Sequence, residues 1–127
     1  MTSITSITTA MFAVADQDAA VAFYTEKLGW ELRSDTKFGE GDDAGRWVEV
    51  APPGSETVLA LNTPMGGQPG GGSIGVETGD VEAEHQQLGA TDGVRVGDLM
   101  GGQGPVPRMF SVNDPDGNWI WVVQPPK

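Results

Sequence analysis

Few side chains in this chain could carry covalent or metal chemistry. It contains no cysteine and one histidine, His85. This excludes a thiolate metal site, a cysteine nucleophile and a metal triad built on two histidines. His85 follows Asp80 by five residues on an expected helix, and we interpret it as a helix-surface residue rather than a ligand or a catalytic group. Acid–base or metal chemistry would therefore fall to carboxylates such as Glu49, Glu56 and Glu77.

Tryptophans form a second group of candidate functional residues. Trp119 and Trp121 alternate with Ile120 near the end of the chain, so both indoles should point to the same face of a strand. Large aromatic residues at this spacing are often core residues, but their flat rings also provide stacking surface for a planar ligand. The residues alone leave both interpretations open.

The segment Asp114–Asn118, with the sequence DPDGN, predicts the turn of a β-hairpin. Proline presets φ, aspartate can bond back to the chain, and glycine adopts a positive φ without a steric clash. Alternating runs flank the turn at 108–113 and 119–123. The turn therefore fixes which residues of the last strand share a face.

The remaining elements follow from periodicity and from helix-stop signals. A Gly/Pro-rich connector at 64–72 divides one domain into halves, 1–63 and 73–127. Each half has the pattern β-α-β-β-β, with Asp16 or Asp80 as the helix N-cap and Gly29 ending the first helix. The predicted strands are 8–15, 30–38, 46–51, 57–62, 74–78, 94–99, 108–113 and 119–123, and the predicted helices are 16–28 and 80–91.

Composition limits the classes of partner. The net charge is −11, which argues against nucleic-acid binding because phosphates require Lys and Arg partners. This charge either maintains solubility or attracts a cationic ligand. The N-terminus lacks the pattern of a signal peptide, and no apolar run approaches the roughly 20 residues of a membrane span. We expect a soluble cytoplasmic protein that binds neither nucleic acid nor membrane.

Two segments together resemble a known superfamily. Residues 14–30 (VADQDAAVAFYTEKLGW) resemble its first helix, with the pattern D-x-x-x-A-x-x-F-Y-x-x-x-L-G, and residues 110–121 (FSVNDPDGNWIW) resemble the end of its last module. This is the vicinal oxygen chelate superfamily, which includes glyoxalase I, bleomycin-resistance proteins and extradiol dioxygenases. The resemblance implies an α+β fold of two tandem βαβββ modules whose mixed sheets curl around a cleft. A second chain often completes that cleft, which implies a homodimer.

The resemblance also implies where metal-dependent relatives would place their ligands. The corresponding positions here are Thr9 and Ser73 on the first strand of each module, Asn62 with Glu56 just outside the fourth strand, and Trp121 on the eighth. A tryptophan nitrogen is a donor only and cannot replace a carboxylate ligand. We therefore expect no metal and no other cofactor.

Alternation along the strands then indicates the cleft-facing residues. Met11 should share the cleft-facing side with Thr9, Glu77 with Ser73, and Trp119 with Trp121. On the third strand either Trp47 with Glu49 or Arg46 with Val48 faces the cleft. The loop Gly97–Pro107 is either a lid or disordered. The predicted ligand-binding residues are Thr9, Met11, Trp47, Ser73, Glu77, Met100, Trp119 and Trp121.

The function that we expect is sequestration. A metal-free protein resembling the bleomycin-resistance branch would bind an aromatic or apolar natural product or antibiotic, cationic ones included, and confer resistance by stoichiometric capture without catalytic residues. The alternative is a lyase, isomerase or dioxygenase-like enzyme of the same superfamily, using Glu49, Glu56 and Glu77 as a non-family metal site or one carboxylate as a base. A third possibility is a domain with no small-molecule role.

Overall fold

The computed structural model describes residues 2–41, 44–64 and 66–126. Both halves of the chain have the predicted element order, with a helical turn, η1, added after the first helix. The first half contains β1 (Thr9–Ala13), α1 (Gln17–Ala22), η1 (Phe23–Lys27), β2 (Glu31–Phe38), β3 (Gly45–Ala51) and β4 (Val58–Asn62). The second half contains β5 (Ser73–Glu77), α2 (Val81–Gly89), β6 (Arg95–Val96), β7 (Arg108–Asn113) and β8 (Trp119–Gln124).

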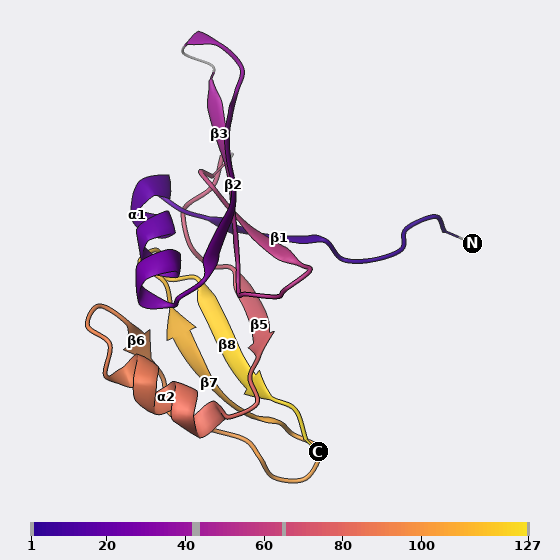
Figure 1. Cartoon of the computed structure of the whole chain (residues 1–127), viewed down its shortest axis with the longest axis vertical. Coiled ribbons are helices and arrows are strands. Elements are labelled where there is room, and N and C mark those ends of the chain that lie inside the picture. The colour runs from indigo at the N-terminus through magenta and orange to yellow at the C-terminus, as the bar shows by residue number, and fades with distance from the viewer. Residues whose placement is uncertain (1, 42–43, 65, 127) are drawn as a thin grey trace.

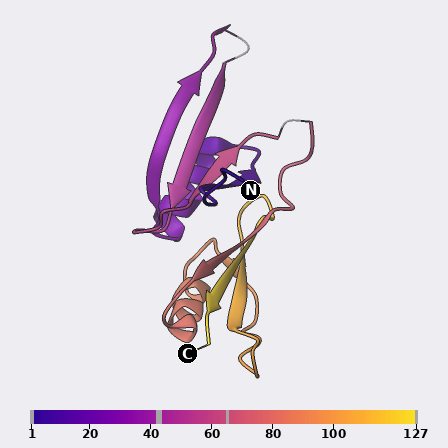
Figure 2. The same ribbon diagram turned by 90° about the vertical axis from the view of Figure 1, so that its right-hand side faces the viewer.

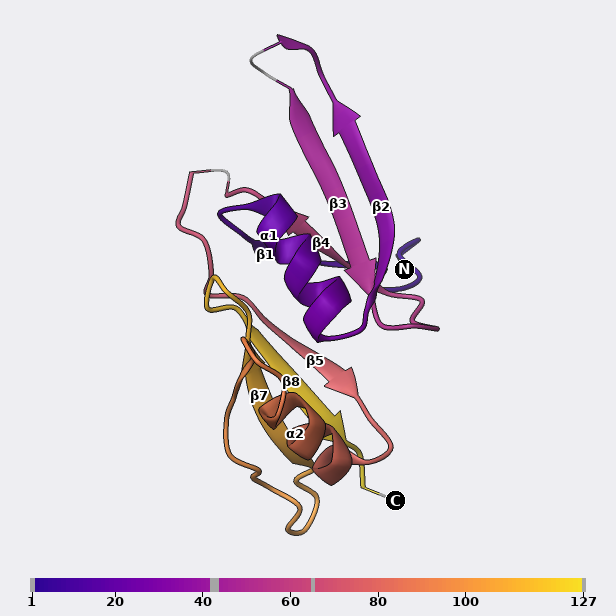
Figure 3. The same ribbon diagram turned by 60° about the vertical axis from the view of Figure 1, so that its left-hand side comes forward.

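Each half forms one four-stranded mixed sheet with a helix against it (Figure 1). The strand orders are β1-β4-β3-β2 and β5-β8-β7-β6. β1 pairs in parallel with β4, and β5 pairs in parallel with β8. All other strand pairs are antiparallel. These features confirm the predicted α+β fold of two tandem βαβββ modules. The N-terminal and C-terminal modules lie one beyond the other, and the β2–β3 hairpin of the N-terminal module extends away from the C-terminal module (Figures 2 and 3).

The first helix changes geometry midway. Asp16 caps it as predicted, because its Oδ1 accepts the backbone N–H three residues further on at 3.1 Å. The helix is α-helical only to the end of α1 and continues as the π-helical turn η1, where Leu28 N–H donates to the Phe23 carbonyl at 3.2 Å. Both Phe23 and Tyr24 are buried along this wider turn. Gly29, with φ at +76°, ends the segment as predicted.

The second helix begins as predicted. The Asp80 side chain accepts the Ala83 N–H at 3.1 Å and caps α2. Among the described residues, no helix is both long and apolar enough to cross a bilayer.

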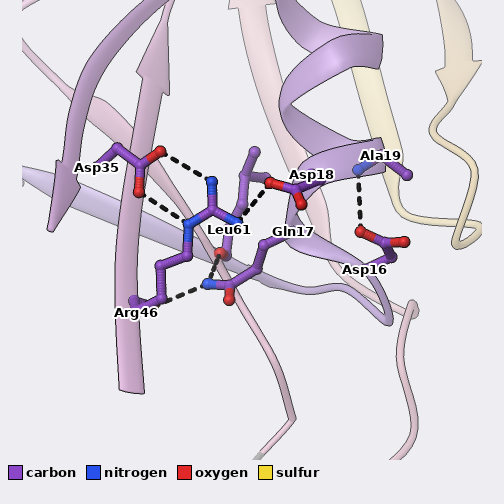
Figure 4. Close-up of polar contacts among 7 residues, drawn as sticks. All are labelled: Asp16, Gln17, Asp18, Ala19, Asp35, Arg46 and Leu61. Atoms are coloured by element: carbon purple, nitrogen blue, oxygen red, sulfur yellow. Dashed lines mark hydrogen bonds and ion pairs between the residues drawn. The ribbon is translucent and has the colours of Figure 1, made fainter. Parts of the chain in front are cut away.

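One guanidinium group fastens α1 to the β2–β3 hairpin (Figure 4). Arg46 on β3 donates two hydrogen bonds of 2.8 Å to Asp35 on β2 and one of 2.6 Å to Asp18 on α1. The hydrogen bonds from Arg46 hold the pKa of Asp35 below its ordinary value. Gln17 donates to the backbone carbonyls of Arg46 and Leu61 at 2.8 and 2.9 Å. The first turn of α1 is thereby bonded to β3 and β4, and through Arg46 it is linked to β2.

The helices and the sheets enclose one continuous apolar core to which both modules contribute. Phe12 and Val14 are buried in this core, together with Ile120 and Val122 from β8. Because side chains alternate along a strand, the neighbours of these residues lie on the other side of each sheet. We call the side turned away from the core the open face of each sheet.

A buried hydrogen-bond network centred on Asp114 joins the two modules. Asp114 and Asn118 are 1% and 0% exposed. The Asp114 carboxylate accepts the Tyr24 hydroxyl at 3.0 Å, two backbone N–H groups of its own turn at 2.9 Å, and Nδ2 of Asn118 at 2.9 Å. Asn118 also donates to the Ala13 carbonyl at 3.1 Å and accepts the Gly72 N–H at 2.9 Å. The predicted hairpin turn therefore also binds the first strand, the first helix and the connector.

The connector passes so close to this turn that it requires glycine. Gly70 donates its N–H to the Ala13 carbonyl at 2.9 Å and has φ at +88°. A Cβ atom there would lie 2.2 Å from the Asp116 carbonyl oxygen. The described part of the connector is thus bonded to both modules, which its composition did not predict.

The Tyr24–Asp114 hydrogen bond should contribute measurably to stability. In Tyr24→Phe the buried carboxylate loses a donor, and we expect the free energy of unfolding to fall by about 1.5–3 kcal/mol. Urea denaturation monitored by circular dichroism measures this loss. The control Ser55→Ala removes an exposed hydroxyl bonded to the Thr57 carbonyl at 2.7 Å and should change stability by less than about 0.5 kcal/mol. Equal losses in both variants would contradict the role of the network.

The same pair should make stability depend on alkaline pH. Burial, and then the negative charge of Asp114, raises the pKa of Tyr24 far above its ordinary value, which is about 10 in an unfolded chain. Its stabilising contribution is therefore complete below about pH 10 and is lost as pH rises further, because only the unfolded state then releases the proton. Tyr24 is the only tyrosine, so this loss should be absent from Tyr24→Phe. Parallel pH curves for the two proteins would contradict the assignment.

Candidate functional site

The open face of the C-terminal sheet carries a pair of stacked indoles. Their rings lie nearly parallel, at 11°, with centroids 5.9 Å apart. Trp119 is 42% exposed and Trp121 is half-buried, whereas Ile120 between them is buried in the core. The alternation predicted for β8 is therefore correct, and the two rings form one continuous aromatic surface.

Strand register places further predicted residues on this face. In β5, Ser73 lies opposite Trp119 and Glu77 lies opposite Val123. Met100 pairs with Met109, which in turn pairs with Val123. Directly paired residues share a face, so five of the eight predicted ligand-binding residues lie on the open face of this sheet: Ser73, Glu77, Met100, Trp119 and Trp121.

The other three predicted residues lie on the open face of the N-terminal sheet. Met11 is 63% exposed, and Thr9 shares its face by alternation. The structure also resolves the register of β3. Val48 is fully buried, whereas Glu49 lies opposite Ala60, which places Trp47 and Glu49 on the open face. A second strand carboxylate, besides Glu77, is thus available to a ligand.

A cleft of about 570 Å³ lies between the modules, but, apart from Glu77, it is not lined by the residues that were predicted to line a cleft. Its walls are the turn Pro52–Ser55 with the start of β4, the edge of β5, and the indole of Trp30. Of the predicted ligand-binding residues only Glu77 lines it. The sequence does contain a signal for one wall, since Pro-Pro-Gly between two strands forms a rigid turn. However, contact of that turn with β5 depends on how the modules pack.

The four positions that correspond to family metal ligands hold two hydroxyls, an amide and an indole. Thr9 and Asn62 lie on adjacent strands of one sheet, and Ser73 and Trp121 on adjacent strands of the other. The Asn62 Oδ1 atom is buried with no hydrogen-bond partner among the described residues. Hydroxyl, amide and indole groups do not form the His and carboxylate sets that transition metals prefer. The described part of the chain also gathers no three His, Asp or Glu side chains elsewhere.

His85 differs from the sequence interpretation. It was expected on the outer surface of α2, but it is partly buried, with Nε2 2.9 Å from the Gly97 carbonyl oxygen. Its ring also packs edge-on against Phe110, with centroids 4.9 Å apart. These contacts attach α2 to the residues after β6, so His85 has a structural role that helical periodicity alone did not reveal.

The Gly97–Pro107 loop was predicted to be a lid or disordered, and in the structure it is hydrogen-bonded to β7. The Gly97 N–H donates to the Ser111 carbonyl at 2.8 Å, and Met100 and Met109 exchange hydrogen bonds of 2.9 and 2.8 Å. One extra residue therefore bulges out between these two contacts, which ends the regular strand β6 after two residues and shortens the predicted run 94–99. The loop extends β7 as an irregular hairpin and positions Met100.

The fold and the site define a two-module α+β protein with an aromatic open face. A model of the glyoxalase/bleomycin resistance protein/dioxygenase superfamily matches residues 6–122. The chain therefore belongs to this superfamily.

Solved structures of similar proteins support the same assignment. TnmS3, an antibiotic binding protein from Streptomyces sp. CB03234, is 33% identical and superposes with a TM-score of 0.81 over 99% of this chain and 100% of its own. A superfamily member from Sphaerobacter thermophilus DSM 20745 is 32% identical, with a TM-score of 0.81 over 95% of this chain and 98% of its own.

Curated sequence relatives match over a shorter part. The uncharacterized protein YetH of Bacillus subtilis (strain 168) is 40% identical over 58 residues, which is 46% of each chain. The match thus spans less than half the length of this relative.

The metal-ligand positions generate a testable expectation. Because Thr9, Asn62, Ser73 and Trp121 supply neither imidazole nor carboxylate, we expect no transition metal to bind with a dissociation constant of about 1 µM or tighter. Calorimetric titration with Zn²⁺, Ni²⁺ and Mn²⁺, with elemental analysis of the purified protein, measures this. One tightly bound equivalent per chain would contradict the expectation.

Proposed function

We propose that this protein sequesters an aromatic or largely apolar small molecule, such as a natural product or antibiotic, by stoichiometric binding without a metal. The observation that carries the proposal is the stacked pair Trp119 and Trp121 on a sheet face turned away from the core. Large aromatic side chains are normally buried, and an exposed apolar surface often marks a binding site. Indoles bind planar rings through apolar burial and stacking.

Similarity to known proteins supports this choice of ligand. TnmS3 is an antibiotic binding protein, and it is 33% identical to this chain over nearly its whole length. Capture of an antibiotic in the cytoplasm would withhold it from its target and thereby confer resistance. No reacting group is required for this mechanism, so it suits a face built of indoles and small polar side chains.

We also propose that the functional unit is a homodimer. The predicted ligand-binding residues are divided between the open faces of two different sheets, and β1 and β5 each lie at one end of their sheet. An end strand can pair with another chain through its free backbone groups. A second copy could therefore bring the open face that carries Trp47 opposite the open face that carries Trp121.

Mass measurement tests the dimer. Light scattering coupled to size exclusion should give twice the mass of the 13.3 kDa chain at protein concentrations of tens of micromolar. A monomeric mass under these conditions would contradict the dimer, although it would leave binding to a single open face possible.

Truncation of Trp121 tests the proposed ligand site. Trp121→Ala should weaken the binding of planar aromatic compounds by on the order of 2 kcal/mol, because it removes both stacking and apolar surface. Quenching of the remaining tryptophan fluorescence, checked by equilibrium dialysis, measures the affinity. Trp119→Ala should cost less, because its ring is more exposed than that of Trp121.

The control for this test is Leu32→Ala. Leu32 is an exposed apolar residue, 46% accessible, in a strand of the other module, and its truncation should leave ligand affinity unchanged. If a broad panel of planar compounds fails to bind, or if Trp121→Ala only lowers stability, the sequestration proposal loses its support.

A further inference from the structure

A glycine interrupts the open face beside the stacked indoles. Gly75 lies in the middle of β5, and its Cα is directly opposite Trp121 in the parallel ladder. Glycine in the interior of a strand weakens that strand, because it loses more conformational entropy on folding than other residues and provides no side chain to pack. Such a residue usually marks a bulge, a sharp bend, or the close approach of a ligand or another backbone.

The described chain itself does not require this glycine. The register between β5 and β8 runs without a shift from Ser73 to Glu77, so no bulge is present. Gly75 is not among the glycines with positive φ. A Cβ atom built on it would meet no described atom within 4 Å. The approach of a ligand or of another backbone accounts for a glycine with open space around it.

The gap at Gly75 has defined sides. Its neighbours on the same face of β5 are Ser73 and Glu77, whose Cα atoms are roughly 13 Å apart at ~3.3 Å per residue. The Trp121 indole flanks the gap on the adjacent strand. Gly75 and Glu77 also line the 570 Å³ cleft between the modules. The open face therefore has a flat area at Gly75, beside the Trp121 indole, and this area borders the cleft between the modules.

The two ends of this surface carry opposite charges. Glu77 is an exposed carboxylate at one end of the face. Arg95 pairs with Asn113, which pairs with Trp119, so the guanidinium-bearing residue belongs to the row at the opposite end. A ligand with one cationic group should therefore place that group at Glu77.

We propose that Gly75 determines ligand specificity. The ligand is a fused-ring compound that stacks on Trp121 and extends across Gly75. A protonated amine on a tether of this compound lies at Glu77. This inference rests on the proposed sequestration function and specifies its ligand class. The absence of a side chain at Gly75 lets the ring plane lie across two strands. The adjoining cleft accommodates the tether.

Two anthraquinones serve as probes: quinizarin, which is uncharged at neutral pH, and mitoxantrone, which carries protonated amines on flexible tethers. Gly75→Val places a branched side chain where the ring would lie and should weaken both probes at least about tenfold, with Gly75→Ala intermediate. Gly75→Val should not lower stability, because valine favours strands and its Cβ atom would meet no described atom within 4 Å. The matched control is Gly79→Ala, another glycine whose added Cβ would meet no described atom within 4 Å. Its affinities should equal those of the wild type.

The carboxylate is tested separately. Glu77→Gln should weaken mitoxantrone about fivefold at low salt and leave quinizarin unchanged, because only the cationic probe loses an attraction that salt would screen. The control Glu82→Gln removes a carboxylate on α2 and should affect neither probe. Equal losses for both probes in Glu77→Gln would overturn the assignment of the amine to Glu77.

The outcomes separate this inference from the proposed function. If the wild type binds the probes and Trp121→Ala loses them, but Gly75→Val binds as tightly as the wild type, the role of Gly75 is overturned while sequestration stands. If Gly75→Val dissociates the dimer, the glycine accommodates another backbone and the inference is again overturned. If the wild type binds neither probe with a dissociation constant of about 100 µM or tighter, sequestration of this ligand class and the inference both fail.

Discussion

The buried carboxylate of Asp114 is the constraint on which the architecture depends. A carboxylate without solvent must be compensated by hydrogen bonds, and here the compensating donors come from its own turn, from Asn118 and from Tyr24 in the other half of the chain. Neither half could bury this group alone at the same low cost. The bonds that satisfy it also fix the hairpin turn, and the turn sets which residues of β8 face the core.

The orientation of β8 in turn produces the candidate site. Ile120 and Val122 are held in the core, so the indoles of Trp119 and Trp121 are left on the other side of the sheet. Under the proposed function, affinity comes from the area and flatness of this surface, with charge adding direction. Such a site does not need metal-binding side chains, because stoichiometric capture requires a long-lived complex and no chemical reaction.

The sequence predicted those features that depend on local chemistry and on alternation. The N-caps at Asp16 and Asp80, the stop at Gly29 and the faces of β8 all follow from neighbouring residues. The features that escaped prediction depend on contacts distant in the chain. The register of β3, the packing of His85 against Phe110 and the cleft beside Trp30 required knowledge of how strands and modules meet. The π-helical turn also escaped prediction, because such turns are rare and the apolar residues Val21, Tyr24 and Leu28 recur at ordinary α-helical spacing.

The bonds of Arg46 have a consequence for local motion. Strand β2 is almost wholly exposed, so its backbone pairing with β3 has little apolar packing to protect it, and such segments open far more readily than the core. Because Arg46 on β3 binds both Asp35 on β2 and Asp18 in the first turn of α1, an opening of the hairpin that displaces Arg46 also removes the partner of Asp18 at the start of the helix. Hydrogen-exchange rates in these two segments, distant in sequence, would then rise and fall together as one cooperative unit.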